Sequence, residues 1–317
     1  MSAVPVISLQ RARQGDEAAV ADEISRACTE VGFFVVRDHG IEPKVFDDAY
    51  DVSMEFFRRP TEEKREHAMR TLTSRGDNDY SPYGYSALLS ENAYAYTGKH
   101  GMPADYVEKL SVGRLVLDDA EELPFPADER GTALRSALKA YFAACETLAD
   151  RIAELLTVAL ELPRDFFATR TNKSNDSLRS HYYPGLHEEF LNDQGMGEHT
   201  DGTLITLLTQ DGPGLQLRDL SGTWRDVGVD QRDWFIVNIG DLMARWSNDE
   251  YVSTPHRVKL ADQPRQSIVF FKLANDDTLI ECFPKFVRER PARYEPILYE
   301  TFSLQKMNAL FGREGGA

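Results

Sequence analysis

The chain has 317 residues and carries 36 Lys and Arg against 52 Asp and Glu, which gives a formal net charge of −16. With 42% hydrophobic and 10% aromatic residues it can bury a large core, which excludes wholesale disorder. The acidic balance argues against nucleic acid and against anionic membrane surfaces as partners, because both would need a basic face. Small molecules stay open as substrates, since one local Arg can override the global field.

The cysteines and the N-terminal residues bear on the compartment. The three cysteines, Cys28, Cys145 and Cys282, are scattered and have no CxxC spacing, so they indicate neither a disulfide framework nor a thiolate zinc site. The first residues lack the apolar core of a signal peptide, and no stretch approaches the ~18 uninterrupted apolar residues of a membrane span. We therefore expect a cytoplasmic protein.

The first half of the chain is predicted to be mainly helical. Up to residue 70 the patterns predict a strand, a helix, a buried strand and two further helices, over residues 4–9, 16–31, 33–37, 43–58 and from Pro60 onward. Residues 70–127 are polar and rich in Tyr and Gly, which is typical of long loops with brief strands. Between Leu134 and Ala159 an apolar stripe at helical spacing predicts the longest helix.

The second half changes to short strands separated by Gly, Pro, Asn and Asp. Runs of β-branched and aromatic residues predict strands at 177–183, 203–210, 214–219, 224–227, 234–240, 256–260 and 266–273. Such strands without intervening helices favour an antiparallel sandwich or barrel. A final helix is predicted between Glu295 and Leu310.

A candidate metal site lies among these strands. We place His199 and Asp201 at a strand edge, where residues i and i+2 point to the same face and can hold one ion. His256 is the best-placed third ligand, because it begins a strand in the same half of the chain. Two His and one carboxylate leave three open positions, as in non-haem Fe(II) oxygenases. The alternative is that these are ordinary structural histidines.

Nine residues after His256, Arg265 and Ser267 share one face of a strand that otherwise reads as core. A cation directed into a barrel needs an anionic partner, because an unpaired buried charge is costly. A dicarboxylate that chelates iron at one end would supply that partner at the other. The alternative for Arg265 is a surface charge in the turn after Pro264.

Taken together, these motifs resemble the iron(II)/2-oxoglutarate-dependent oxygenases, within them the isopenicillin-N-synthase-like family. The likeness covers nearly the whole chain. Near the N-terminus it rests on VPVISL and EVGFFVVRDHGI, and before the metal motif on LRSHYYPG. Its specific blocks are GEHTDGTLITLLTQDGPGLQL, NIGDLMARWSNDEYVSTPHRVKL and RQSIVFFKLANDD.

The resemblance implies an α+β fold with a double-stranded β-helix (jelly-roll, cupin-like) core and with N-terminal and flanking helices. We expect one compact unit with four regions. These are an N-terminal oxygenase region at 1–127, a supporting helix and connection at 128–174, the jelly-roll catalytic core at 175–290, and a C-terminal helix and tail at 291–317.

The resemblance also implies the chemistry: oxidation of a small organic metabolite (hydroxylation, desaturation or cyclisation) within secondary metabolism, coupled to conversion of 2-oxoglutarate and O2 into succinate and carbon dioxide. The residues that match the Fe(II) ligands are His199, Asp201 and His256. Those that match the 2-oxoglutarate site are Arg265, Ser267 and Tyr183. We expect substrate contacts from Phe271, which can equally be a core aromatic, and from Tyr83 and Tyr85.

Two features of the pattern stay open. Plant members often have Asn where this chain has His181, and we favour a polar pocket residue over an extra metal ligand there. The Tyr-rich segment at about 79–106 and the C-terminal helix near 298–310 are expected to cover the barrel mouth.

Rival functions are a 2-oxoglutarate-independent oxidase like isopenicillin N synthase, a non-catalytic jelly-roll binding module and a zinc hydrolase with the same ligands. In the first of these, Arg265 would hold the substrate. The second is expected to show a broken triad, and the third leaves Arg265 and Ser267 without a purpose. A monomer is favoured.

Overall fold

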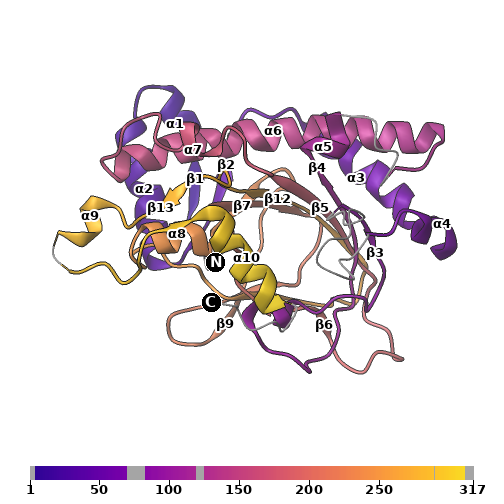
Figure 1. Cartoon of the computed structure of the whole chain (residues 1–317). Coiled ribbons are helices and arrows are strands. Elements are labelled where there is room, and N and C mark those ends of the chain that lie inside the picture. The colour runs from indigo at the N-terminus through magenta and orange to yellow at the C-terminus, as the bar shows by residue number, and fades with distance from the viewer. Residues whose placement is uncertain (1–3, 70–82, 119–124, 289, 311–317) are drawn as a thin grey trace.

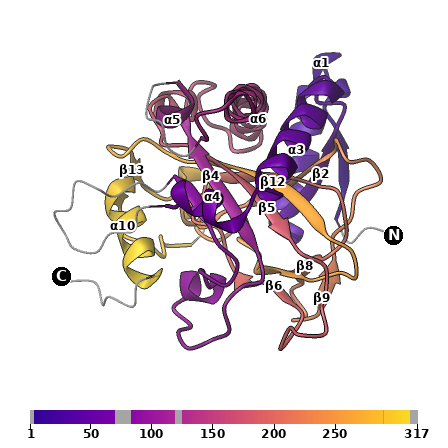
Figure 2. The same ribbon diagram turned by 90° about the vertical axis from the view of Figure 1, so that its right-hand side faces the viewer.

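Two β-sheets face each other in the computed structural model, and helices cover the outer face of the larger sheet (Figures 1 and 2). The structure describes residues 4–69, 83–118, 125–288 and 290–310. This arrangement is the α+β jelly-roll architecture that the sequence predicts.

The larger sheet contains eight strands among the described residues. They are β1 (Val6–Ser8), β2 (Phe33–Arg37), β3 (Gly84–Ser86), β4 (Glu108–Gly113), β5 (Ser177–Tyr183), β7 (Ile205–Gln210), β10 (Phe235–Ile239) and β12 (Arg265–Lys272). Their order is β1-β2-β10-β7-β12-β5-β4-β3, and the pairs are antiparallel except for β1 with β2. Strands from residues 1–127 thus flank the strands of the predicted catalytic core on both sides.

The smaller sheet has the order β6-β11-β8-β9. Its strands are β6 (Gln194–His199), β8 (Leu215–Arg218), β9 (Trp224–Asp226) and β11 (His256–Lys259). A separate pair is formed by β13 (Leu279–Ile280) and β14 (Ile297–Leu298). The predicted strands are confirmed with shifts of one or two residues at their ends, whereas β6, β13 and β14 were not predicted.

The predicted helices are also present, together with several short ones that the sequence analysis missed. The α-helices are α1 (Gln10–Arg13), α2 (Glu17–Glu30), α3 (Pro43–Phe57), α4 (Thr61–Glu66), α5 (Arg114–Asp118), α6 (Glu129–Ala159), α7 (Ala168–Thr171), α8 (Asp241–Trp246), α9 (Pro284–Val287) and α10 (Tyr299–Leu310). A 3₁₀ helix, η1, spans Ala93–Thr97. No helix in the described part of the chain is both long enough and apolar enough to cross a membrane.

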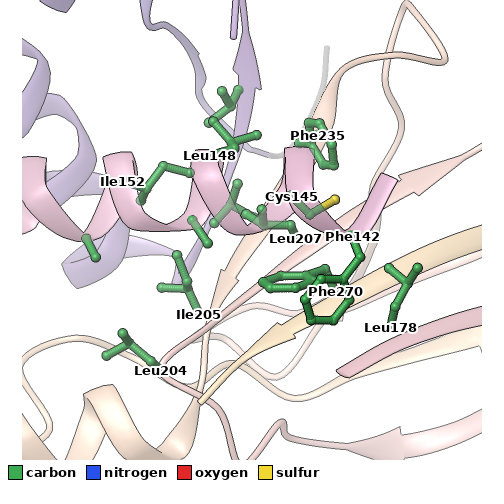
Figure 3. Packing of buried hydrophobic residues seen from close by; sticks show 14 of the residues in the cluster. Phe142, Cys145, Leu148, Ile152, Leu178, Leu204, Ile205, Leu207, Phe235 and Phe270 are labelled. Carbon is green, nitrogen blue, oxygen red and sulfur yellow. The ribbon is translucent and has the colours of Figure 1, made fainter. Parts of the chain in front are cut away.

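Helix α6 carries the main core contact. It begins where the Asp128 carboxylate accepts a hydrogen bond from the Gly131 amide, 2.7 Å away, and this cap satisfies one of the free N–H groups of the first turn. Its predicted apolar stripe packs on the outer face of the larger sheet (Figure 3). The labelled residues of that contact are Phe142, Cys145, Leu148, Ile152, Leu178, Leu204, Ile205, Leu207, Phe235 and Phe270.

Alternation along the strands separates this core from the site. On β12 the side chains of Ile268 and Phe270 belong to the helix-facing core, whereas Ser267, Val269 and Phe271 line a cavity between the sheets. Successive strand residues point to opposite faces, so one strand both anchors the helices and supplies the site.

Candidate active site

The structure brings His199, Asp201 and His256 together, as predicted. His199 is the last residue of β6, and His256, the first residue of β11, is its register partner. Asp201 lies in the loop after β6 and not in a strand. The predicted i, i+2 geometry on a single strand is therefore wrong, because the chain leaves the sheet directly after His199 and the loop turns the carboxylate toward the histidines.

The three side chains are buried and close. The Asp201 Oδ1 atom lies 3.9 Å from His199 Nε2, and Asp201 Oδ2 lies 3.8 Å from His256 Nε2. The two imidazole centroids are 4.3 Å apart, and one ligand atom from each residue falls within 4.8 Å of the others. This group is compact enough to share a single ion.

Hydrogen bonds fix both imidazoles with Nε2 directed at the shared position. His199 Nδ1 lies 2.8 Å from the Gly197 carbonyl, and His256 Nδ1 lies 3.1 Å from the Thr254 carbonyl. A carbonyl only accepts, so each Nδ1 carries a proton, which leaves Nε2 as the ring atom available to a metal. Burial, followed by the neighbouring His256, lowers the pKa of His199 to about 3, which keeps that imidazole neutral.

The carboxylate is held from behind by two donors. Thr206 Oγ1 and Asn238 Nδ2 each donate to Asp201 Oδ2 at 2.8 Å. Burial alone would raise the pKa of Asp201, but the two nearby histidines and these hydrogen bonds bring it below its ordinary value. Two neutral imidazoles and one ionised carboxylate are the ligand set of a facial Fe(II) triad. The donors fit the metal that the sequence predicts.

Arg265, Ser267 and Tyr183 lie together at the adjoining end of the barrel. The Arg265 guanidinium sits over the Tyr183 ring at 4.8 Å and donates from Nη1 to Ser267 Oγ at 3.4 Å. Gln210 Oε1 accepts from Arg265 Nη2 at 2.7 Å. Arg265 is 2% exposed and has no carboxylate partner among the described residues. An oriented and unpaired cationic fork of this kind suits a carboxylate ligand.

Two cavities meet at the triad. The narrower one, of about 40 Å³, is lined by the three metal-site residues together with Ser267 and Tyr183. The larger one, of about 230 Å³, shares His199 and Asp201 and extends toward η1 and α10. Figures 1 and 2 show α10 at one end of the two sheets, where it contacts η1. The two segments predicted to cover the barrel mouth thus supply one wall of this cavity.

Of the three residues expected to contact substrate, one lines the cavities and two do not. Phe271 lines both cavities. Tyr83 and Tyr85 line neither: Tyr83 packs against Gly113, and the buried Tyr85 donates its hydroxyl to Glu108 at 2.5 Å. Those two tyrosines face the helix-covered core because β3, to which Tyr85 belongs, pairs with β4 at the edge of the larger sheet. Among the described tyrosines of the Tyr-rich segment, Tyr96 lines the larger cavity.

His181 is buried on the inner face of β5, and neither ring nitrogen has a hydrogen-bond partner among the described residues. It lines both cavities and lies beside Tyr183, with ring centroids 6.1 Å apart. Burial and three neighbouring cations lower its pKa well below the usual value, so the ring is neutral. This placement matches the polar pocket residue favoured from the sequence and not a fourth member of the metal group.

Several functional candidates were missed in the sequence. Arg179 could have been found, because it precedes His181 and Tyr183 at i, i+2 spacing on a predicted strand. Gln210, Thr206 and Asn238 come from strands that were predicted, but nothing in a single sequence marks which polar strand residues support a ligand. Tyr96 and Lys306 come from the covering segments, whose path was not predictable.

Comparison with known proteins agrees with this geometry. Residues 4–129 match the family "non-haem dioxygenase in morphine synthesis N-terminal", and residues 174–273 match the "2OG-Fe(II) oxygenase superfamily". Gibberellin 20 oxidase 1 of Arabidopsis thaliana is 30% identical over 289 residues, covering 87% of this chain and 71% of the relative. A 2-oxoglutarate-Fe(II) type oxidoreductase of Emericella nidulans, hxnY, is 30% identical and covers 94% and 86% of the two chains.

Solved structures show the same relationship. A full-length Neurospora crassa protein, solved in complex with alpha-KG, superposes with a TM-score of 0.82 at 27% identity, over 96% of this chain and 95% of that one. The protein therefore belongs to the 2-oxoglutarate/Fe(II)-dependent oxygenase family. It is an oxidoreductase of small organic molecules that uses Fe(II), 2-oxoglutarate and O2.

Proposed function

We propose that His199, Asp201 and His256 hold the Fe(II) of this oxygenase and that Arg265, Ser267 and Tyr183 bind 2-oxoglutarate. The observation that carries the proposal is the buried group of two imidazoles and one carboxylate, together with a buried guanidinium that has no carboxylate partner among the described residues. Bound there, Fe(II) supplies the redox chemistry by which O2 and 2-oxoglutarate oxidise a substrate, with release of succinate and carbon dioxide.

The residues of the chain orient the co-substrate. Arg265 can pair with its remote carboxylate, while the Ser267 hydroxyl lies beside the same guanidinium and the Tyr183 ring lies under it. Gln210 holds the fork in place from one side, and the Gly212 carbonyl accepts from Arg265 Nε at 3.2 Å. The pairing is strong because both partners are charged and water is excluded.

The substrate would enter the larger cavity, beside His199 and Asp201. Phe271 forms part of its wall, and α10 with η1 forms the outer wall. Such a cover limits contact between a reactive site and water. We infer that the wall formed by α10 and η1 adjusts around the bound substrate, whose identity sets the reaction outcome.

Anaerobic protein loaded with Fe(II) should be mixed with 2-oxoglutarate, exposed to O2 and assayed for succinate, with and without candidate metabolites. Stoichiometric succinate and oxidised product support the assignment. Product formation without succinate would indicate a 2-oxoglutarate-independent oxidase in which Arg265 holds the substrate.

We further propose that the protein works in the cytoplasm as a monomer on small molecules alone. The net charge of −16 disfavours nucleic acid and anionic membranes, and the three cysteines are buried and free, which suits a reducing compartment. Light scattering at micromolar concentration tests the monomer, and fractionation of native cells tests the compartment.

A further inference from the structure

A second arginine, Arg179, is partly buried and lines the larger cavity. Arg179 lies on the inner face of β5, and its Nε is buried without a hydrogen-bond partner among the described residues. Its Nη1 donates a long bond of 3.4 Å to the Tyr96 hydroxyl, and its guanidinium lies 5.4 Å from the centre of the Phe271 ring. The Arg179 guanidinium is thus held in one direction, but its hydrogen-bonding capacity is not fully used.

The acidic residues near Arg179 are already engaged. Glu91 forms a 2.8 Å salt bridge with Lys109, whose side chain is fully buried. Burial would raise the pKa of Glu91, but Lys109 and then Arg179 lower it to about 2, so this one carboxylate serves two cations. Asp201, whose field also reaches Arg179, belongs to the metal site. Lys306, on the opposite wall, pairs with Asp241 at 2.5 Å.

Arg179 itself has no carboxylate within salt-bridge distance among the described residues, because Glu91 is bound to Lys109 and the nearby Asp105 accepts from the Ala93 and Gly197 amides and from Gln194. An uncompensated charge in a partly dry site is costly unless a ligand supplies the opposite one. A single carboxylate matches one planar fork, whereas a phosphate monoester, with nearly two negative charges at neutral pH, would be under-compensated.

The remainder of the cavity is largely apolar. Its lining includes Met196, Phe271, Leu273, Phe302 and Met307. A volume of about 230 Å³ suits a small molecule. The cavity thus combines one anion-binding point, a largely apolar body, and two of the proposed metal ligands, His199 and Asp201.

We propose that the substrate is a small monocarboxylic acid with an apolar body, whose carboxylate pairs with Arg179 and the Tyr96 hydroxyl. This inference rests on the proposed function, because it places the oxidised carbon beside His199 and Asp201. The paired carboxylate fixes one end of the molecule, so the distance from Arg179 to the triad would determine which C–H bond reacts.

The test compares acids with their uncharged counterparts. Phenylacetic, 3-phenylpropanoic, cinnamic and octanoic acids, each beside its primary amide, should be titrated calorimetrically into anaerobic protein loaded with Mn(II) and 2-oxoglutarate. We expect at least one acid to bind about 10- to 100-fold more tightly than its amide, the difference typical of a charge-assisted pair in a partly desolvated site. A panel in which no acid exceeds its amide overturns the proposal.

Variants then assign the effect to the residue. Arg179→Gln should bring acid and amide to within about threefold of each other, and Arg179→Lys should restore part of the preference, since an ammonium keeps the charge and loses the fork. Arg288→Gln, at a side chain that is 67% exposed, is the matched control and should keep the full preference. An Arg179→Gln protein that keeps the preference overturns the proposal.

Two measurements separate this inference from the proposed function. Calorimetry of 2-oxoglutarate itself should be unchanged in Arg179→Gln, which also shows that the variant is folded. If wild-type protein fails to bind 2-oxoglutarate, the metal and co-substrate assignment fails. If it binds 2-oxoglutarate but does not prefer acids, only the carboxylate inference fails. Should Arg179→Gln not fold, the acid-to-amide ratio of wild type and Arg179→Lys still decides the question.

Discussion

The Asn238 side-chain amide donates to Asp201 Oδ2 at 2.8 Å, and this bond connects β10 to the loop that carries the carboxylate. Thr206 on β7 donates to the same oxygen at the same distance. Asp201 is therefore held by neighbouring strands of the larger sheet, although it follows a strand of the smaller one. The metal site depends on the packing of the two sheets against each other.

Replacing Asn238 should weaken metal binding without removing a ligand. In Asn238→Leu the carboxylate loses one of its two orienting donors, and loss of such support typically costs about 10–100-fold in metal affinity or activity. Titration with Mn(II) measures the effect. Asn175→Leu, an exposed change in the loop before β5, is the control and should bind normally. Unchanged Mn(II) affinity in Asn238→Leu would show that Thr206 alone positions Asp201.

Removing a proposed metal ligand should lower metal affinity more than the Asn238 substitution does. His256→Ala should retain little iron and show no detectable succinate release, because two ligands remain of three. Iron content after desalting and the rate of succinate release are the measurements. The exposed His187→Ala gives the matched change at a histidine outside the metal group. A His256→Ala protein with normal iron and normal rate would refute the triad assignment.

The 2-oxoglutarate site can be tested through Gln210, which touches Arg265 and not the proposed metal ligands. Gln210→Leu removes the 2.7 Å partner and frees the guanidinium to turn, so we expect a roughly 10-fold higher requirement for 2-oxoglutarate with iron binding retained. Arg265→Leu should raise the requirement further, by roughly tens- to thousands-fold, and Arg265→Lys should recover only part. Equal 2-oxoglutarate dependence in all four proteins would assign Arg265 to substrate or to structure.

The Glu91–Lys109 pair predicts a pH dependence of stability. Because the folded-state pKa of Glu91 is about 2, below the ordinary 4.5, its ionised form stabilises the fold above about pH 4.5, and this contribution is lost as pH falls toward 2. Glu91→Gln leaves Lys109 buried without its partner and should lower the free energy of unfolding at pH 7 by about 1–3 kcal/mol.

Urea unfolding at pH 7 and at pH 3 measures the free energy of unfolding of both proteins. The difference in this free energy between wild type and Glu91→Gln should be smaller at pH 3 than at pH 7. Glu62→Gln, in a salt bridge whose carboxylate is 83% exposed, should change stability by less than about 0.5 kcal/mol at either pH. A gap for Glu91→Gln that widens on acidification would contradict the assigned pKa direction.

The sequence predicted the strands that are rich in β-branched and aromatic residues, and it missed β6 as well as the two-residue strands β13 and β14. β6 reads QGMGEH, which lacks the β-branched and aromatic residues that mark a strand. Its Gly197 is required by packing, since a Cβ there would lie 2.5 Å from the Tyr94 ring. The triad was predicted although its local geometry was not, because the ligand motif identifies residues while the loop after His199 sets their directions.

The residues that line the larger cavity could be predicted from the sequence only in part. Period-two spacing on β5 places Arg179 on the face of Tyr183, so that residue was within reach of sequence reasoning. The sequence could not show that Tyr96 lines the cavity in place of Tyr83 and Tyr85. The path of an irregular segment depends on tertiary packing and not on local propensity.

The placement of β2 between β1 and β10 also determines how the chain can be divided. Phe33 from β2 lines the narrower cavity and meets the His256 ring edge-on at 5.5 Å. A fragment beginning at residue 175 would lack this aromatic wall and would expose the long apolar edge of β10, which invites aggregation. Exchange of N-terminal segments between related enzymes would therefore alter the metal site itself, so chimaeras joined near residue 127 are expected to be poor tools for transferring substrate specificity.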